Sequence, residues 1–242
     1  MKFSSKDFGN NYQNQTIKSE EYSYSYGIEN INQFVKRTYQ LLAGSLLAGS
    51  VGAYVGMGFV NKMVSATGLT FTYWGAVIFE FILLFALFAL KRKTPLNLVV
   101  LFAFTFMTGF TLAPTLAMFL AKNMGYVIGE AFLLTSVAFA GLTIFAMNTK
   151  RDFTTMGKML FITLIVVVVA SIVNIFLHLP ILSLIIASVS AILFSFFILY
   201  DTQNIINGYI ETEIEAAVAL YLDFFNLFVS LLQILGFLNS EE

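Results

Sequence analysis

The chain has 242 residues, of which 58% are hydrophobic and 11% charged, and its formal net charge at pH 7 is −1. A soluble domain ordinarily carries about 25% charged residues, so this composition excludes a soluble globular protein. The lack of a basic surplus argues against nucleic-acid binding. The absence of cysteine excludes a disulfide scaffold, a cysteine nucleophile and a cysteine-ligated metal site. What remains is an all-α polytopic membrane protein.

The first 34 residues differ from the rest of the chain. They are rich in Asn, Gln, Ser and Tyr, with a tyrosine–serine run at 22–27, and they show no sustained hydrophobic period. We therefore predict residues 1–34 to be a disordered polar tail and residues 35–242 to form a transmembrane domain. No apolar stretch follows the first basic residues, so the sequence does not predict a signal peptide.

Seven apolar stretches follow, separated by short polar breaks. Each is close to the ~20 residues that a helix needs to cross the ~30 Å hydrocarbon core of a bilayer. Only His178, Leu179 and Pro180 separate the fifth stretch from the sixth. We interpret the proline as the start of a new helix; one long broken helix is the alternative. The seven predicted spans are residues 38–60, 71–90, 96–119, 126–147, 158–178, 181–200 and 216–238.

The positions of the basic residues predict the orientation in the membrane. Eleven of the 13 Lys and Arg residues lie in the tail, the second connection and the fourth connection, and only Lys62 and Lys122 lie on the other side. The positive-inside rule then places the N-terminus in the cytoplasm. Because the number of spans is odd, the C-terminus lies on the periplasmic or extracellular side. The sixth connection, residues 201–215, has no basic residue and carries three glutamates.

Small residues and one proline predict local packing. Four small residues recur at intervals of four in the first span, which lets another helix approach closely: Gly44, Ala48, Gly52 and Gly56. Pro114 in the third span predicts a structural kink or a hinge, and the sequence leaves both open. His178 is the only histidine, and without neighbouring ligands it is interpreted as a turn residue.

Ionisable residues inside the spans are the candidates for function. An ionisable side chain at the centre of a bilayer costs ~2.5–3.5 kcal/mol on insertion scales, so it is seldom kept without a role. Glu80 lies in the second span, Asp223 in the seventh, and Asp201 at the end of the sixth. Glu80 could line a polar route through the bundle or form a hydrogen bond with a neighbouring helix, and the sequence does not separate these alternatives.

Asp201 and Asp223 form the most specific pattern. They lie 11 residues before and 11 residues after Thr212, near the polar centre of the last connection. If the last two spans form a symmetric hairpin, both carboxyl groups lie at one depth. Facing each other, they would share a proton, and the ionised pair would suit a hard cation such as Ca²⁺. Alternatively, Asp201 ends its helix at the interface and Asp223 binds a neighbouring hydroxyl.

Lys91 and Arg92 lie at the cytoplasmic end of the second span. A cation there could pair with Asp201 in one conformation and release it in another, which would make Lys91 or Arg92 a latch. The alternative is that both are ordinary positive-inside anchors. The sequence contains no nucleophile elbow, zinc motif or phosphate loop. An enzyme is therefore not expected, and no cofactor is predicted apart from Ca²⁺ as a transported ion.

Several motifs occur together over residues 35–238. They are Phe79-Glu80, the segment 108–114, the segments 149–157 and 170–174, Tyr200-Asp201-Thr202-Gln203 and the segment 220–228. In this combination the chain resembles a bacterial member of the Bax inhibitor-1 family of membrane proteins. The resemblance implies seven transmembrane helices, with the last one central within the other six.

The resemblance also implies a pH-sensitive calcium leak. The two aspartates that act as the family's pH sensor match Asp201 and Asp223, and an acidic position associated with the ion route matches Glu80. The basic latch at the cytoplasmic end of the second helix matches Lys91, with Arg92 as its neighbour. If the family residue is arginine, Lys91 cannot form the same bidentate pair.

A second class of function follows from the same resemblance. Some bacterial members modulate a membrane-bound AAA protease, and eukaryotic members restrain cell death. The polar tail could dock to such a protease. The resemblance thus implies a multi-pass protein of the bacterial inner membrane that interacts with the lipid bilayer, Ca²⁺ and protons, or alternatively acts as a regulator of the protease.

Overall fold

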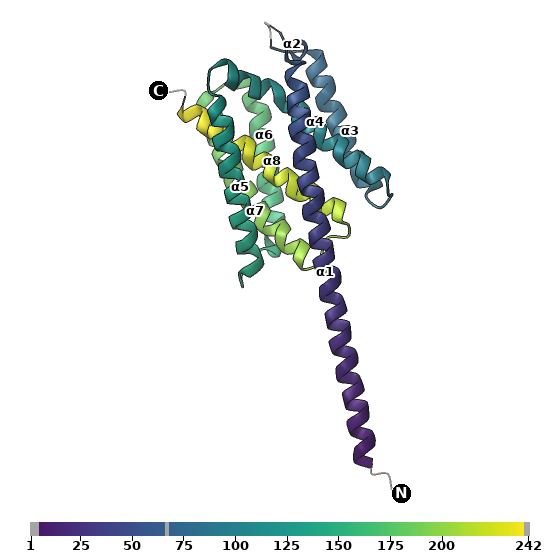
Figure 1. Ribbon diagram of the computed structural model, residues 1–242. Coiled ribbons are helices and arrows are strands. Elements are labelled where there is room, and N and C mark those ends of the chain that lie inside the picture. Colours follow the sequence, from purple (N-terminus) through teal and green to yellow (C-terminus); the bar gives the residue numbers. More distant parts are fainter. Residues whose placement is uncertain (1–4, 66–67, 240–242) are drawn as a thin grey trace.

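The computed structural model describes residues 5–65 and 68–239, and within them it is a bundle of long helices (Figure 1). Seven helices in this part of the chain are long and apolar enough to cross a membrane, as predicted. They are α1 (Ser5–Met57), α3 (Phe71–Leu90), α4 (Leu96–Ala121), α5 (Gly125–Asn148), α6 (Gly157–Leu177), α7 (Pro180–Ile206) and α8 (Glu213–Leu238). The fold is therefore an all-α polytopic membrane protein.

Short elements connect the long helices. Between α1 and α3 lie the single turn α2 (Val60–Met63) and two antiparallel strands of two residues each, β1 (Val64–Ser65) and β2 (Gly68–Leu69). A 3₁₀ turn, η1 (Thr154–Met156), leads into α6. These elements turn the chain at the ends of the bundle.

α1 begins much earlier than the first predicted span. It starts at Ser5, so the helix continues through most of the segment predicted as a disordered tail, and only residues 1–4 of that segment lie outside the described part. Figure 1 shows this first half of α1 projecting away from the bundle. A helix that is already nucleated by a membrane span propagates at low cost, which explains the difference. The part of α1 that can span a membrane is Asn30–Met57.

α8 is the central helix of the bundle. It packs against α7, α1, α5 and α4, while α3 and α6 lie further out, against α4 and α7 (Figure 1). Leu220, Tyr221 and Leu232 of α8 are almost completely buried. Most apolar side chains of α3 and α6 are exposed, as expected for helices that face lipid.

α1 and α4 approach each other most closely at glycines. A Cβ atom on Gly52 would collide with the carbonyl oxygen of Phe106, and one on Gly109 would collide with the carbonyl oxygen of Gly49. The small-residue stripe predicted in α1 therefore packs against α4. Gly49 of α1 and Gly109 of α4 also take part in this contact. α4 continues through Pro114 without ending.

The turn between α6 and α7 confirms the two-helix interpretation of this region. His178 ends α6 with a left-handed backbone at φ 52°, and Pro180 occupies the first turn of α7. Asn174 braces the turn, because its Nδ2 donates to Ser183 Oγ at 2.6 Å and its Oδ1 accepts from the backbone N–H of Leu179 at 3.1 Å. His178 is thus a turn residue, as predicted.

Candidate functional site

Asp201 of α7 and Asp223 of α8 meet in a pocket near one end of the bundle. The pocket has a volume of about 550 Å³, and side chains of α3, α6, α7 and α8 surround it. We call it the aspartate pocket, and the polar residues that line it are Tyr200, Asp201, Asn204, Tyr209, Glu215, Asp223 and Asn226.

The two carboxyl groups line the same pocket and interact with each other. A hydrogen bond between them requires a proton on one, because a carboxylate can only accept. The side chain of Asp201 also interacts with that of Asn204. Asp223 is only 3% exposed, and its Oδ2 has no hydrogen-bond partner in the described part of the chain. An unpartnered buried carboxyl oxygen is costly, so this atom is the one most available to a proton or a cation.

The hairpin that brings the aspartates together differs from the predicted symmetric one. α7 ends at Ile206 and α8 begins at Glu213, so the centre of the turn precedes Thr212. Asp201 lies five residues before the end of α7, and Asp223 lies ten residues after the start of α8. An offset of five residues is about 7.5 Å along a helix, so the two helices do not pair in a symmetric register about the turn.

Thr212 fixes the start of α8. Its Oγ1 accepts a hydrogen bond from the backbone N–H of Glu215 at 3.2 Å, which is the usual arrangement of a threonine N-cap. Glu213 and Glu215 lie in the first turn, where the helix dipole favours negative charge. The acidic sixth connection therefore has a local role in helix capping.

The same glutamates bind basic residues that are far away in the sequence. Lys91 Nζ lies 2.9 Å from Glu215 Oε2 and 3.2 Å from Glu211 Oε2. Arg92 forms a 2.6 Å ion pair with Glu211, and Arg37 of α1 lies 3.5 Å from Glu213. Glu215 also lines the aspartate pocket. This ion-pair cluster and the aspartate pocket lie at the same end of the bundle. We call this end of the bundle the basic end.

The ion-pair cluster holds its members in their charged forms. Hydrogen bonds from Arg92 and Lys91 lower the pKa of Glu211 below its ordinary value. Hydrogen bonds to Glu215 and Glu211 raise the pKa of Lys91. In this structure Lys91 therefore binds glutamates, and its pairing with Asp201 stays a prediction. The sequence indicated that such ion pairs could form, because the acidic sixth connection has no basic residue and lies on the same side as the basic second and fourth connections.

Glu80 lies apart from the aspartate pocket, on the contact between α3 and α4. Its Oε2 accepts a hydrogen bond from Thr111 Oγ1 at 2.7 Å. One turn away, the hydroxyl groups of Thr108 and Tyr221 are hydrogen-bonded, and Tyr221 also donates to the carbonyl of Thr105. The hydroxyl groups of Thr111 and Thr108 on α4 therefore lie between Glu80 of α3 and Tyr221 of the central helix α8. Two roles were predicted for Glu80: lining a polar route or forming a hydrogen bond with a neighbouring helix. The structure has the hydrogen bond, with Thr111 of α4.

Gln203 connects two of the motifs identified in the sequence. Its Oε1 accepts from the backbone N–H of Phe153 at 2.6 Å, and its Nε2 donates to the carbonyls of Arg151 at 2.8 Å and Ala146 at 3.3 Å. The loop 149–153 is therefore held against the end of α7. The sequence contained Gln203 within a motif but gave no sign of its partners.

The carboxyl pair does not form a complete metal site. Within residues 5–65 and 68–239, no group of three or more His, Cys, Asp or Glu side chains could hold a metal ion. Ca²⁺ takes six to eight oxygen ligands. Asp201 and Asp223 supply at most four, so a Ca²⁺ ion here would keep part of its water shell.

Comparison with known proteins identifies the family. A family model described as "Inhibitor of apoptosis-promoting Bax1" matches residues 31–240. The chain belongs to the Bax inhibitor-1 family. The two motifs that meet at Gln203 and the two that meet in the aspartate pocket all lie inside the matched region.

Bacterial relatives align with this family member over most of their length. An uncharacterized protein of Campylobacter jejuni is 55% identical over 232 residues, which cover 93% of this chain and 100% of the relative. A protein of Helicobacter pylori strain J99 is 46% identical over 209 residues, covering 86% and 88%. The Escherichia coli K12 protein named "Modulator of FtsH protease YccA" is 34% identical over 213 residues, covering 87% and 92%.

Proposed function

We propose that this Bax inhibitor-1 family protein is a pH-sensitive cation leak, primarily for Ca²⁺, with Asp201 and Asp223 as its proton sensor. The observation that supports it most is their meeting in the aspartate pocket, where one oxygen of Asp223 is buried without a partner. A pair that shares a proton carries one negative charge. Loss of that proton leaves two adjacent carboxylates, which repel each other and attract a divalent cation.

Lys91 is the better candidate for the latch than Arg92. Lys91 already contacts Glu215, which lines the aspartate pocket, whereas the partner of Arg92 is the more exposed Glu211. Exchange of Lys91 between Glu215 and a newly ionised Asp201 would move the start of α8 relative to α3. Glu80 remains a candidate for the ion route, although it lies at the contact between α3 and α4 and does not line the aspartate pocket.

We place the protein in the bacterial inner membrane, with the basic end and the N-terminus in the cytoplasm and the C-terminus on the periplasmic or extracellular side. The distribution of Lys and Arg supports this orientation. A relative from Escherichia coli O6:H1, 34% identical, is named "Inner membrane protein YccA". The helical segment before Asn30 then extends into the cytoplasm, where it is accessible to a partner.

Calcium flux into proteoliposomes tests the leak. The purified full chain is reconstituted, and Ca²⁺ uptake is followed with an internal dye from about pH 5 to pH 8. The double variant Asp201→Asn/Asp223→Asn should lose the pH dependence of the flux, while Glu130→Gln, which changes an exposed acid of α5, should keep it. If the double variant keeps both the flux and its pH profile, the mechanism is wrong.

The second candidate function is modulation of a membrane-bound AAA protease. It is favoured by the relative whose name describes a modulator of the FtsH protease. Deletion of residues 1–28 would remove the projecting part of α1 and leave the span that starts at Asn30 intact. If the segment docks to the protease, the deletion abolishes co-purification and leaves the flux unchanged. Unchanged co-purification would argue against that role of the segment.

A further inference from the structure

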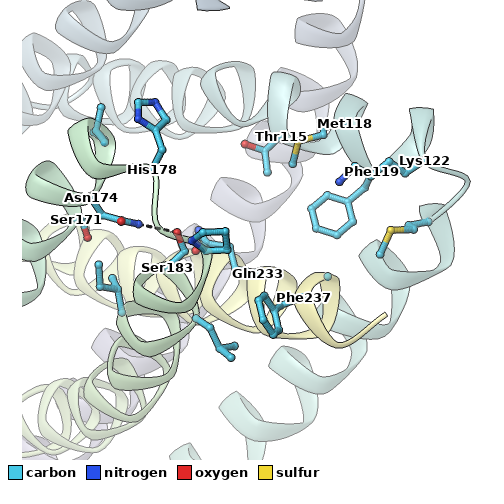
Figure 2. A pocket seen from close by; sticks show the side chains of 16 residues that line it. Thr115, Met118, Phe119, Lys122, Ser171, Asn174, His178, Ser183, Gln233 and Phe237 are labelled. Carbon is cyan, nitrogen blue, oxygen red and sulfur yellow. Dashed lines mark hydrogen bonds between the residues drawn. The ribbon is translucent and has the colours of Figure 1, made fainter. Parts of the chain in front are cut away.

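A second pocket opens at the end of the bundle opposite to the basic end. Its volume is about 680 Å³. Figure 2 shows the hydrogen-bonded pair Asn174 and Ser183 together with Gln233 on one side, and Phe119 and Lys122 across from them. We call it the far pocket, and its polar lining residues are Thr115, Lys122, Ser171, Asn174, His178, Ser183 and Gln233.

The central helix carries one polar face from the aspartate pocket to the far pocket. Asp223, Asn226, Ser230 and Gln233 are spaced by three, four and three residues, which places them on one side of α8. Asp223 and Asn226 line the aspartate pocket, and Gln233 lines the far pocket. The polar face therefore connects the two pockets.

The neighbouring helix α7 has a matching face. Ser183 lines the far pocket, and Asp201 lines the aspartate pocket five turns later. Ser190 lies seven residues after Ser183 and 11 before Asp201, which are whole numbers of helical turns. Because α7 and α8 pack against each other, both pockets open on one seam between these helices.

The two pockets are separated by a short buried layer. Asn226 and Gln233 are seven residues apart, about 10 Å along α8. Within this stretch the only polar side chain of α8 is Ser230, which is 5% exposed, and Ser190 of α7 is 7% exposed. Ser190 lies 11 residues before Asp201 and Ser230 lies seven residues after Asp223, so the two serines lie within about 6 Å of each other in depth, inside the buried layer.

We propose that the α7–α8 seam is a water-accessible route joining the two pockets, closed in this structure by the layer at Ser190 and Ser230. The cation of the proposed function, on which this part of the inference rests, passes along it. Two observations independent of the serine spacing support the route: the pockets at both ends, and the unpartnered buried oxygen of Asp223, a residue that lines one of them.

The chemistry of the layer fits a closed gate. Ser230 donates its hydroxyl hydrogen to the carbonyl of Asn226 at 2.7 Å, which leaves the hydroxyl oxygen as an acceptor for water or a cation. Serine side chains are small, so a slight separation of α7 and α8 would admit a water molecule. Lys122 lines the far pocket and no Asp or Glu does. The far pocket therefore offers no carboxylate to hold a cation, and of the two pockets only the aspartate pocket can bind one.

Cysteine accessibility tests the route, since the chain has no cysteine of its own. Ser190→Cys and Ser230→Cys are reconstituted separately, with Ile192→Cys as the matched control, because Ile192 lies close in depth on α7 but is 61% exposed toward lipid. A small, positively charged methanethiosulfonate reagent reacts with thiolates in water and not with thiols buried in lipid. Asn226→Cys and Gln233→Cys, at the two pockets, report on correct folding.

The expected result is that Ser190→Cys and Ser230→Cys react at least about tenfold faster than Ile192→Cys under conditions that permit flux, and that modification stops the flux. If they react no faster than Ile192→Cys while the unmodified chain conducts Ca²⁺, the route is refuted and the proposed function stands. If they react fast while the unmodified chain conducts no Ca²⁺, the route is supported and the proposed function fails.

Discussion

Lys91 Nζ lies 2.9 Å from Glu215 Oε2, and this ion pair ties the turn after α3 to the first turn of the central helix. Glu215 also lines the aspartate pocket, eight residues before Asp223 on the same helix. The ion pair thus lies between the solvent at the basic end and the buried carboxyl groups. It can hold the pocket closed without touching either aspartate.

Removal of the Lys91 charge should therefore open the pocket. We predict that Lys91→Gln increases Ca²⁺ flux at neutral pH, because Glu215 and Glu211 then lose their shared cation and repel each other. The measurement is the initial rate of Ca²⁺ uptake in proteoliposomes. Lys93→Gln is the matched control, since Lys93 is an exposed lysine of the same turn. Equal rates for the two variants would show that the ion pair does not hold the pocket closed.

Ion pairs at the basic end do not sense pH in the neutral range. The contribution of Glu211 to stability is present above the ordinary glutamate pKa of about 4.3 and is lost as the pH falls through its lowered pKa. The contribution of Lys91 is fully present below the ordinary lysine pKa of about 10.4 and is lost as the pH rises through its raised pKa. Both groups are therefore charged from about pH 5 to pH 10.

It follows that Glu211→Gln should change the size of the flux and leave its pH midpoint in place. Flux profiles of the variant and the unmodified chain, recorded from about pH 5 to pH 8, provide the comparison. Salt should act on the same pairs, because 1 M salt reduces the Debye length to about 3 Å and screens exposed charges. A shifted midpoint in Glu211→Gln would assign the pH response to the ion-pair cluster.

Hydropathy predicted the existence and approximate bounds of the membrane spans, but it ended the sixth span too early. The predicted end at residue 200 reflects the polar residues 201–204, yet α7 continues to Ile206. These residues remain helical because other elements satisfy them: Gln203 binds the loop 149–153, and Asp201 faces α8. The hydropathy of a segment depends only on its own residues, so it cannot indicate that another part of the chain binds its polar side chains.

The acids of the candidate site were predictable from the sequence, and so was the side on which its ion pairs form, but the individual partners in those ion pairs were not. Asp201 and Asp223 stood out because charges are rare in spans, and a hairpin brings consecutive helices together. The partners of Lys91 and Arg92 lie 124 and 119 residues away in the sequence, so only the fold, which brings the turn after α3 next to the start of α8, determines them. The far pocket left no signal, because its polar residues are scattered over four helices.

The role of Glu80 can be separated from its structural hydrogen bond. Glu80→Gln keeps an oxygen that accepts from Thr111 Oγ1 and removes the charge. If Glu80 attracts cations, we expect lower Ca²⁺ flux with an unchanged thermal unfolding temperature in detergent. Glu80→Ala removes the acceptor as well and should also lower the unfolding temperature. Unchanged flux in Glu80→Gln would assign Glu80 to helix packing alone.

The contact between α1 and α4 depends on glycine at position 109. Gly109→Ala would force a Cβ atom into the backbone of α1 at Gly49, so we expect destabilisation of about 1–3 kcal/mol, as for other overpacked sites. Gly129→Ala is the control, because nothing lies within 4 Å of its Cβ position and alanine favours the helix. Thermal unfolding in detergent should therefore shift in opposite directions. A stable Gly109→Ala variant would mean that α1 and α4 can separate without loss.

Gln203 should be intolerant of charge. Its Nε2 donates to two backbone carbonyls, of Arg151 and Ala146, while its Oε1 accepts from Phe153. Gln203→Glu would keep the acceptor and place a carboxylate oxygen against two carbonyl oxygens, with a loss of about 1–3 kcal/mol for the unsatisfied groups. The loop 149–153 would then detach from α7. The readout is faster proteolysis at Arg151 in Gln203→Glu than in Gln203→Met, which removes the polar group without adding charge; equal cleavage of the two variants would contradict the assignment.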